Sequence, residues 1–161
     1  MAASYWITQK GSSAHPRRAW TKRDLLGGTP IQHFSCAVGP SAQRSVHPGD
    51  RILIYWPGHG SQLFMGTFAV AGPVTYHSEL PEGWPYAVPL QPRHVIGDPR
   101  EGIPLREAMA LGGDLIRRFA RGACARGLYR IDAPTFDRLE RALAPRAFRG
   151  DFRAVILEAE G

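Results

Sequence analysis

Histidines and carboxylates carry most acid-base and metal chemistry in proteins, and none of their spacings in this chain is diagnostic. The sequence has six histidines and fourteen carboxylates, but no H-x-x-x-H, no G-x-S-x-G and no phosphate loop of the G-x-x-x-x-G-K type. His33 and Cys36 are close in sequence, yet residues i and i+3 of a strand face opposite ways, so a Cys-His dyad is not expected. We therefore predict a protein that is not an enzyme and holds no cofactor and no metal ion.

Arginine supplies nearly all of the positive charge. The chain has 20 Lys and Arg against 14 Asp and Glu, a formal net charge of +6, and only Lys10 and Lys22 are lysines. Five arginines lie between Leu115 and Ile131 with no acidic residue among them, namely Arg117, Arg118, Arg121, Arg126 and Arg130. Because the planar guanidinium matches phosphate and stacks on bases, the first four predict contacts with a nucleic-acid backbone. A merely solvated face is the alternative, since GC-rich coding also favours arginine.

Aromatic residues come from separate segments, mostly strands and their ends. They are Trp6, Phe34, Tyr55, Trp56, Tyr76, Trp84, Tyr86 and Phe119. Most are expected in the core. Two or three aromatic planes left at a rim, beside an arginine-rich segment, would clamp an extruded base by stacking.

The bulk composition is that of an ordinary globular protein. With 161 residues, 43% hydrophobic and 21% charged, the chain is expected to form one domain over 1–161, with 145–161 as a C-terminal extension. No apolar run reaches the roughly eighteen residues of a membrane span, and the N-terminus lacks the pattern of a signal peptide. We expect a cytoplasmic monomer without a membrane partner, in which both cysteines are reduced thiols.

The segment from His47 to Val74 anchors the expected fold. A turn at residues 47–50 precedes a strand at 51–56, and a second strand follows at 62–70. Both faces of this antiparallel pair are apolar, which favours the wall of a closed or packed barrel over a sheet with one wet face. Gly66, in the middle of the second strand, indicates a bulge or a close approach of another backbone or a ligand.

Weaker patterns predict the remaining elements around that pair. The chain should open with a centrally paired strand at 5–8, and Asp114 and Asp132 should each cap a helix. Phe136, Leu139 and Leu143 form one apolar stripe. The other expectations are a helix at 17–26, strands at 31–38, 84–90, 127–131 and 152–157, helices at 105–111 and 115–121, and loops at 76–81 and 91–104.

Taken in order, several of these pieces resemble the EVE domain, a member of the PUA-like superfamily and a relative of the YTH domain. The matching pieces are Tyr5-Trp6-Ile7, the turn and strand from Pro48 to Tyr55, Met65 to Val70 with Gly72-Pro73-Val74, Trp84 to Val88, and Leu128 to Ile131 with its helix. The resemblance implies a mixed α/β (α+β) fold, a small curved sheet or barrel with flanking helices. It also implies an aromatic pocket that in relatives accepts a modified base of DNA or RNA.

The resemblance also implies which residues would line that pocket. Phe34 and Ser35 stand where relatives have a cage aromatic and hydrogen-bonding groups, and Gln9 and Lys10 stand where relatives have polar pocket residues. Either Tyr76 or Trp84 would be the opposing aromatic. Many relatives carry Trp at the position of Phe34, so a smaller platform predicts weaker affinity or a different ligand.

Three functions remain open at this point. The first is a non-enzymatic reader of a modified base, and the second is a PUA-like RNA-binding module without such a pocket. The third is an ASCH-like amidohydrolase acting on modified nucleosides, which uses a lysine with a threonine and a carboxylate. Thr21-Lys22 is the only local match to that arrangement.

Overall fold

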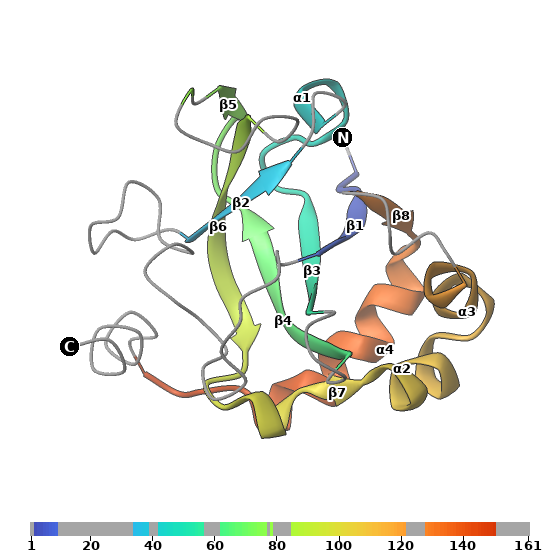
Figure 1. Ribbon diagram of the computed structural model, residues 1–161. Coiled ribbons are helices and arrows are strands. Elements are labelled where there is room, and N and C mark those ends of the chain that lie inside the picture. Colours follow the sequence, from blue (N-terminus) through green and yellow to red (C-terminus); the bar gives the residue numbers. More distant parts are fainter. Residues whose placement is uncertain are drawn as a thin grey trace.

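The computed structural model describes residues 2–9, 34–38, 42–56, 62–76, 78, 85–121 and 128–150. These residues form one curved, eight-stranded sheet with helices beside it (Figure 1). Six strands follow the order β2-β6-β4-β3-β1-β8, β5 pairs with β6, and β7 pairs with β4. The strands are β1 (Tyr5–Gln9), β2 (Phe34–Val38), β3 (Arg51–Trp56), β4 (Leu63–Val70), β5 (Thr75–Tyr76), β6 (Tyr86–Val95), β7 (Ile103–Pro104) and β8 (Tyr129–Ile131).

The predicted central pair is confirmed as β3 and β4. The turn before β3 closes with a 3.0 Å hydrogen bond from Asp50 N to His47 O, and Gly49 adopts the positive φ of 91° that the turn requires. All of β3 after Arg51 is buried. The described strand path is open, since its end strands β2 and β8 do not pair, so burial on both faces comes from packing rather than from closure into a barrel.

Gly66 lies where β4 and β6 come unusually close. A Cβ placed on Gly66 would lie 2.9 Å from Val95 Cα and 3.1 Å from His94 O, both backbone atoms of β6. On the β3 side, the register shifts between Ile54 and Tyr55, opposite this position. The predicted bulge and the predicted close backbone approach are therefore both present.

The opening strand pairs on both edges, as predicted. β1 runs parallel to β3, with Tyr5 opposite Arg51, and antiparallel to β8, with Trp6 opposite Arg130. Two segments distant in sequence thus flank the first strand. The strand predicted at 127–131 is confirmed by β8.

Three helices pack on one side of the sheet, α2 (Leu105–Gly112), α3 (Asp114–Ala120) and α4 (Ala133–Leu143) (Figure 1). Asp132 caps α4 as predicted, because its Oδ1 accepts a 2.9 Å hydrogen bond from Thr135 N. The predicted apolar stripe of α4 is buried. Short helices are α1 (Ala42–Ser45), η4 (Pro99–Glu101) and η6 (Ala144–Arg146). In the described part of the chain, no helix has the length and apolar character needed to cross a membrane.

The cap predicted at Asp114 is wrong. Gly113, with φ 65°, occupies the N-cap of α3 and makes no side-chain cap. Asp114 lies in the first turn, where its carboxylate binds Arg117 instead.

The loop predicted at 91–104 is wrong, because β6 continues to Val95 instead of ending at Leu90, and η4 and β7 follow it. The loop predicted at 76–81 differs at its first residue, since Tyr76 ends the short strand β5; Ser78 lies in a turn, and the other residues of that loop are outside the described ones. In the sequence, Pro85 and Pro89 indicated an edge strand that ends at Leu90. β2 borders β6 only as far as Leu90, so beyond that residue one edge of β6 has no described neighbour, and the missing N–H of Pro92 is tolerated within the strand.

Residues after α4 return to the sheet. Phe148 N donates to Val95 O at 2.8 Å, so the beginning of the expected C-terminal extension is attached to β6. The predicted helix at 17–26 and the predicted strand at 152–157 lie outside the described residues.

The buried carboxylate of Asp50 connects the first strand to the central pair. Asp50 is 4% exposed, and its Oδ1 accepts from Ser4 N at 2.9 Å. Its Oδ2 accepts from His47 N at 3.0 Å and from the indole Nε1 of Trp6 at 3.1 Å. Three donors from two distant segments therefore share one carboxylate.

We predict that Asp50→Ala lowers the free energy of unfolding by about 3 kcal/mol or more, because it leaves these donors without an acceptor. Urea unfolding followed by tryptophan fluorescence measures the loss. Asp137→Ala, which removes an exposed carboxylate of α4, is the control and should change stability by less than about 0.5 kcal/mol. Equal effects of the two substitutions would contradict the structural role of Asp50.

Candidate nucleic-acid interface

We call the face of the sheet that packs against α3 and α4 the helical face, and the other one the opposite face. Contacts between aromatic rings show which strand residues belong to the helical face. Phe119 of α3 packs on Tyr55 and Phe64, with ring centroids 5.1 and 5.9 Å apart, and on Tyr129 at 5.7 Å. Tyr5 likewise meets Phe136 of α4 at 5.1 Å. Because side chains alternate along a strand, the neighbours of these tyrosines in β1, β3 and β8 point the other way.

Buried and polar side chains share the opposite face. By this alternation it carries Trp6, Thr8, Ile54 and Trp56 of β1 and β3. All four are buried. Since α2, α3 and α4 pack elsewhere, none of these helices covers that face.

Phe34 and Ser35 belong to β2, where Phe34 pairs with Leu90 of β6. Tyr76 belongs to β5 and pairs with Tyr86 of the same strand β6. By register, the side chain of Tyr76 falls on the opposite face. The backbone partners of Phe34 and Tyr76 on β6, Leu90 and Tyr86, are four positions apart, roughly 13 Å along the strand.

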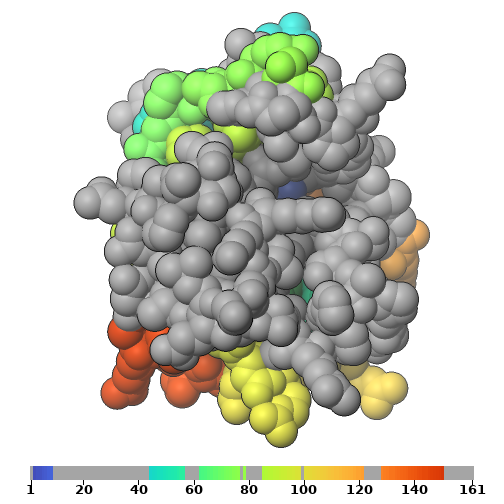
Figure 2. Space-filling view, turned by 60° about the vertical axis from the view of Figure 1, so that its left-hand side comes forward, coloured from blue at the N-terminus to red at the C-terminus, as the bar shows by residue number. Residues whose placement is uncertain are grey.

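Tyr76 is the most exposed aromatic of this region. Its residue is 64% exposed, and its ring meets Tyr86 edge-on with centroids 5.7 Å apart. The green surface at the top of the space-filling view belongs to the described residues between 62 and 78, whose exposed members mostly follow β4 (Figure 2). Gln9 ends β1 beside Tyr55. Lys10 and Trp84 lie outside the described residues, so the predicted pocket stays a prediction.

The predicted phosphate-binding arginines lie on α3. Arg117, Arg118 and Arg121 are exposed at its C-terminal end, and Arg126 lies outside the described residues. Arg117 Nη1 is 3.1 Å from Asp114 Oδ1, so a carboxylate just before the arginine-rich segment offsets part of its charge. Arg118 and Arg121 make no ion pair with another described residue. The α3 patch therefore belongs to the helical side of the molecule.

Arg130 differs from the other arginines of this segment, and the sequence analysis did not assign it to the site. It alternates with Tyr129 and Ile131 on β8 and so belongs to the opposite face. Its Cζ lies 5.7 Å from the centroid of the Trp6 ring, and its Nη2 lies 3.4 Å from Ser4 Oγ. The sequence could have separated Arg130 from Tyr129, because adjacent residues of a strand point to opposite faces.

The indole N–H of Trp56 is a buried donor that has no acceptor among the described residues. Trp56 ends β3 on the opposite face, is 1% exposed, and its Nε1 has no hydrogen-bond partner among the described residues. Burying such a group without a partner costs about 1–3 kcal/mol. An orphan donor of this kind marks a place where an acceptor from water or a ligand would be stabilising.

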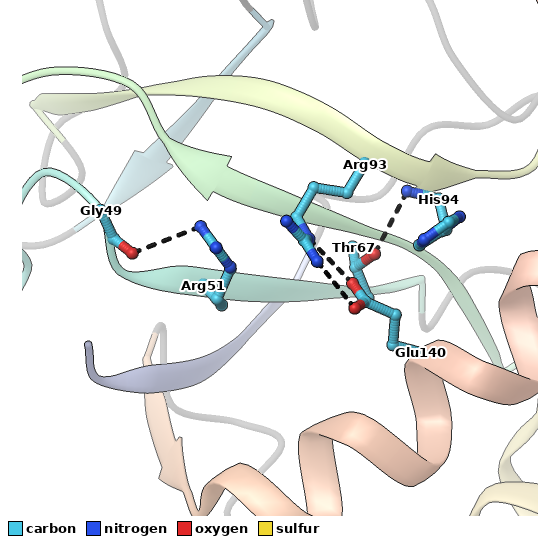
Figure 3. Close-up of polar contacts among 6 residues, drawn as sticks. All are labelled: Gly49, Arg51, Thr67, Arg93, His94 and Glu140. Atoms are coloured by element: carbon cyan, nitrogen blue, oxygen red, sulfur yellow. Dashed lines mark hydrogen bonds and ion pairs between the residues drawn. The ribbon is translucent and has the colours of Figure 1, made fainter. Parts of the chain in front are cut away.

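A polar network joins α4 to the sheet on the helical face (Figure 3). Both guanidinium nitrogens Nε and Nη2 of Arg93 donate to Glu140 at 3.0 Å, and His94 N donates to Thr67 Oγ1 at 3.3 Å. Burial raises the pKa of the Glu140 carboxyl, but hydrogen bonds from Arg93 and Thr67 outweigh it, so that pKa lies below its usual value. The hydrogen bond to Glu140 raises the pKa of Arg93.

This network is not a metal site. Among the described residues, no group of three or more His, Cys, Asp or Glu side chains is placed to hold an ion. The network fixes α4 against β4 and β6.

Comparisons with known proteins give the fold but no close relative. No protein-family model matches the sequence, and no curated protein sequence matches it. Solved structures do match. A protein of Rhodopseudomonas palustris is 13% identical with a TM-score of 0.58, and the match covers 91% of this chain and 97% of that one.

Two further structures were solved with nucleic acid. Human THYN1 protein, which carries the DUF55 or EVE domain, was crystallised with DNA containing 5-methylcytosine; it is 14% identical, with a TM-score of 0.53 and coverage of 92% and 100%. The YTH domain of Zygosaccharomyces rouxii MRB1 was crystallised with N6-methyladenosine RNA; it is 12% identical, with a TM-score of 0.50 and coverage of 88% and 86%. The chain thus has the PUA-like fold shared by EVE and YTH domains, which confirms the expected fold.

We predict that Glu140→Gln lowers the free energy of unfolding by about 1–2 kcal/mol at neutral pH, because it removes a charge-assisted pair that is partly screened by solvent. A carboxyl whose pKa is lowered by folding stabilises the fold above its unfolded pKa, and this contribution is lost as pH falls through the folded pKa. The difference between wild type and variant should therefore shrink below pH 4.5. Urea titrations across the acid range test this, with Asp137→Asn as the control. A pH-independent difference would contradict it.

We also predict that Trp56→Phe destabilises the protein less than Trp6→Phe, by about 1.5 kcal/mol or more. Both substitutions shorten a buried ring, but only Trp6 loses a hydrogen bond, whereas Trp56 loses an unsatisfied donor. Paired urea unfolding curves give the comparison. An equal or larger loss at Trp56 would mean that its N–H has an acceptor in the free protein.

Proposed function

We propose that this chain is a nucleic-acid-binding domain that reads one modified base of DNA or RNA in an aromatic pocket. The observation that carries the proposal is the fold, since the matching human and yeast domains were crystallised with 5-methylcytosine DNA and N6-methyladenosine RNA. A fold alone does not fix a function, so the features of this chain must agree with it.

Charge and hydrogen bonding support the proposal. The net charge of +6, with Arg118 and Arg121 exposed and free of described ion pairs, suits a polyanionic partner. The N–H of Trp56, which has no acceptor among the described residues, lies on the face that also carries Tyr76. Bases offer carbonyl oxygens and ring nitrogens as acceptors for such a donor.

An amidohydrolase is less well supported. Thr67 and Glu140 do provide a threonine and a carboxylate, but the cation beside them is Arg93, whose guanidinium stays protonated and cannot act as a base. Lys22 lies outside the described residues. Turnover of a modified nucleoside that is abolished by Lys22→Ala would establish the enzyme instead.

The test is a binding panel of short single strands and duplexes, in DNA and RNA, with 5-methylcytosine, N6-methyladenosine or the unmodified base at the centre. Fluorescence anisotropy should give tighter binding to one modified strand than to its unmodified match. Equal affinity for every strand would favour the PUA-like module without a base pocket. No binding to any strand would overturn the proposed function.

We predict that Phe34→Ala or Trp84→Ala weakens binding of the preferred strand about 10- to 100-fold, because each removes a stacking surface. Tyr76→Ala should do so if Tyr76 is the opposing wall. Phe148→Ala is the matched control, since it removes a 41% exposed aromatic outside the predicted pocket. Melting temperatures separate the alternatives: a large stability loss in both pocket variants would mean that the two rings are core residues.

A further inference from the structure

Arg130 projects from the last strand of the sheet path, on the face that the helices leave uncovered. β8 has three residues, and its two other side chains pack towards α3 or the core, while Arg130 is exposed. Tyr129 makes the contact with Phe119 that defines the helical face. Arg130 is thus the one arginine of the predicted basic segment, as far as the structure describes it, that belongs to the opposite face.

The guanidinium of Arg130 is held in place before any ligand arrives. It stacks over the indole of Trp6, with 5.7 Å between Cζ and the ring centroid, inside the range of a cation–π interaction. Trp6 is itself fixed, because it is 8% exposed and donates its N–H to the buried Asp50. Fixing a long side chain in advance removes an entropy cost that would otherwise oppose binding.

Most of the hydrogen-bonding capacity of this guanidinium is unused. A guanidinium has five N–H donors, and the bond described here is the long contact from Nη2 to Ser4 Oγ. No carboxylate pairs with Arg130 among the described residues. In contrast, four other arginines each bind a carboxylate, namely Arg93, Arg100, Arg117 and Arg146.

Covering Trp6 accounts for part of this arrangement, because an arginine stem shields apolar surface. Shielding of Trp6 does not explain why the guanidinium is exposed and stacked, with no carboxylate partner among the described residues. A planar fork with free donors, in a fixed orientation, is the group that binds a phosphate in bidentate geometry.

We propose that Arg130 binds a backbone phosphate of the nucleic-acid strand whose base enters the pocket. This inference rests on the proposed function and adds a contact on the face that carries Trp56 and Tyr76. The arginines of α3 lie on the helical side, where they meet another part of the strand. Arg130 therefore supplies a phosphate contact on the same face as Trp56, and α3 supplies general attraction.

The test compares Arg130→Ala and Arg130→Lys with Arg141→Ala. Arg141 is exposed on α4 without a described partner, so its substitution removes one positive charge away from the proposed contact. The probe is the modified strand that wild type prefers in the panel. Arg130→Ala should weaken its binding about tenfold and reduce the steepness of the salt dependence by about one phosphate, while Arg141→Ala should change affinity less than about twofold.

Arg130→Lys keeps the positive charge near Trp6 but loses the planar fork, so it should recover the stability and only a small part of the affinity. If Arg130→Ala does not fold, Arg130→Lys alone tests the phosphate contact. Wild-type affinity and salt dependence in a folded Arg130 variant would overturn this inference while leaving the proposed function intact. Failure of the wild-type protein to bind any strand would overturn the proposed function, and the phosphate contact with it.

Discussion

The carboxylate of Asp50 fixes the first strand to the centre of the sheet. It accepts from Ser4 N, 46 positions earlier in the chain, and from His47 N in the turn that leads into β3. A parallel pair such as β1 and β3 has no connecting hairpin to set its register, so a shared acceptor is an effective way to fix it. The same carboxylate orients Trp6. Asp50 thus holds the ring over which Arg130 lies.

From this anchor, the two faces of the sheet differ in how their polar groups are paired. The helical face buries apolar rings against α3 and α4, and the pair formed by Arg93 and Glu140 adds a polar clamp. The opposite face carries the N–H of Trp56, which has no acceptor among the described residues, and the guanidinium of Arg130, which has no carboxylate partner among them. A buried donor without an acceptor is destabilising for folding alone, which is why these two groups enter the proposed function and the proposed phosphate contact.

Net charge alone describes the basic character of this protein poorly. Arg93, Arg117 and Arg146 are each offset by a carboxylate close by, in two cases one that is distant in sequence. The arginines without a carboxylate partner among the described residues are therefore a subset that the net charge cannot identify. Their placement, rather than the total of +6, determines where a polyanion would be held.

The sequence by itself determined the elements whose signals are local. The turn at residues 47–50, the strands β3 and β4, the bulge at Gly66 and the capped helix α4 follow from turn chemistry, alternation and helical periodicity within about ten residues. The ordered set of weak matches then gave the fold. The loop predicted at 91–104 was wrong because no local pattern shows that β6 continues to Val95 by pairing with β4.

Tertiary structure decided everything that joins distant segments. The contact of Arg130 with Ser4 spans 126 positions, and the pairing of Arg93 with Glu140 spans 47. Neither has a sequence signature, because partners on different strands and helices are selected by register and face rather than by spacing. The same reason separates Arg130 from the arginines of α3, although all belong to one basic segment. The sequence could predict which residue types a candidate site would contain. Only the folded sheet could decide which side chains share a face.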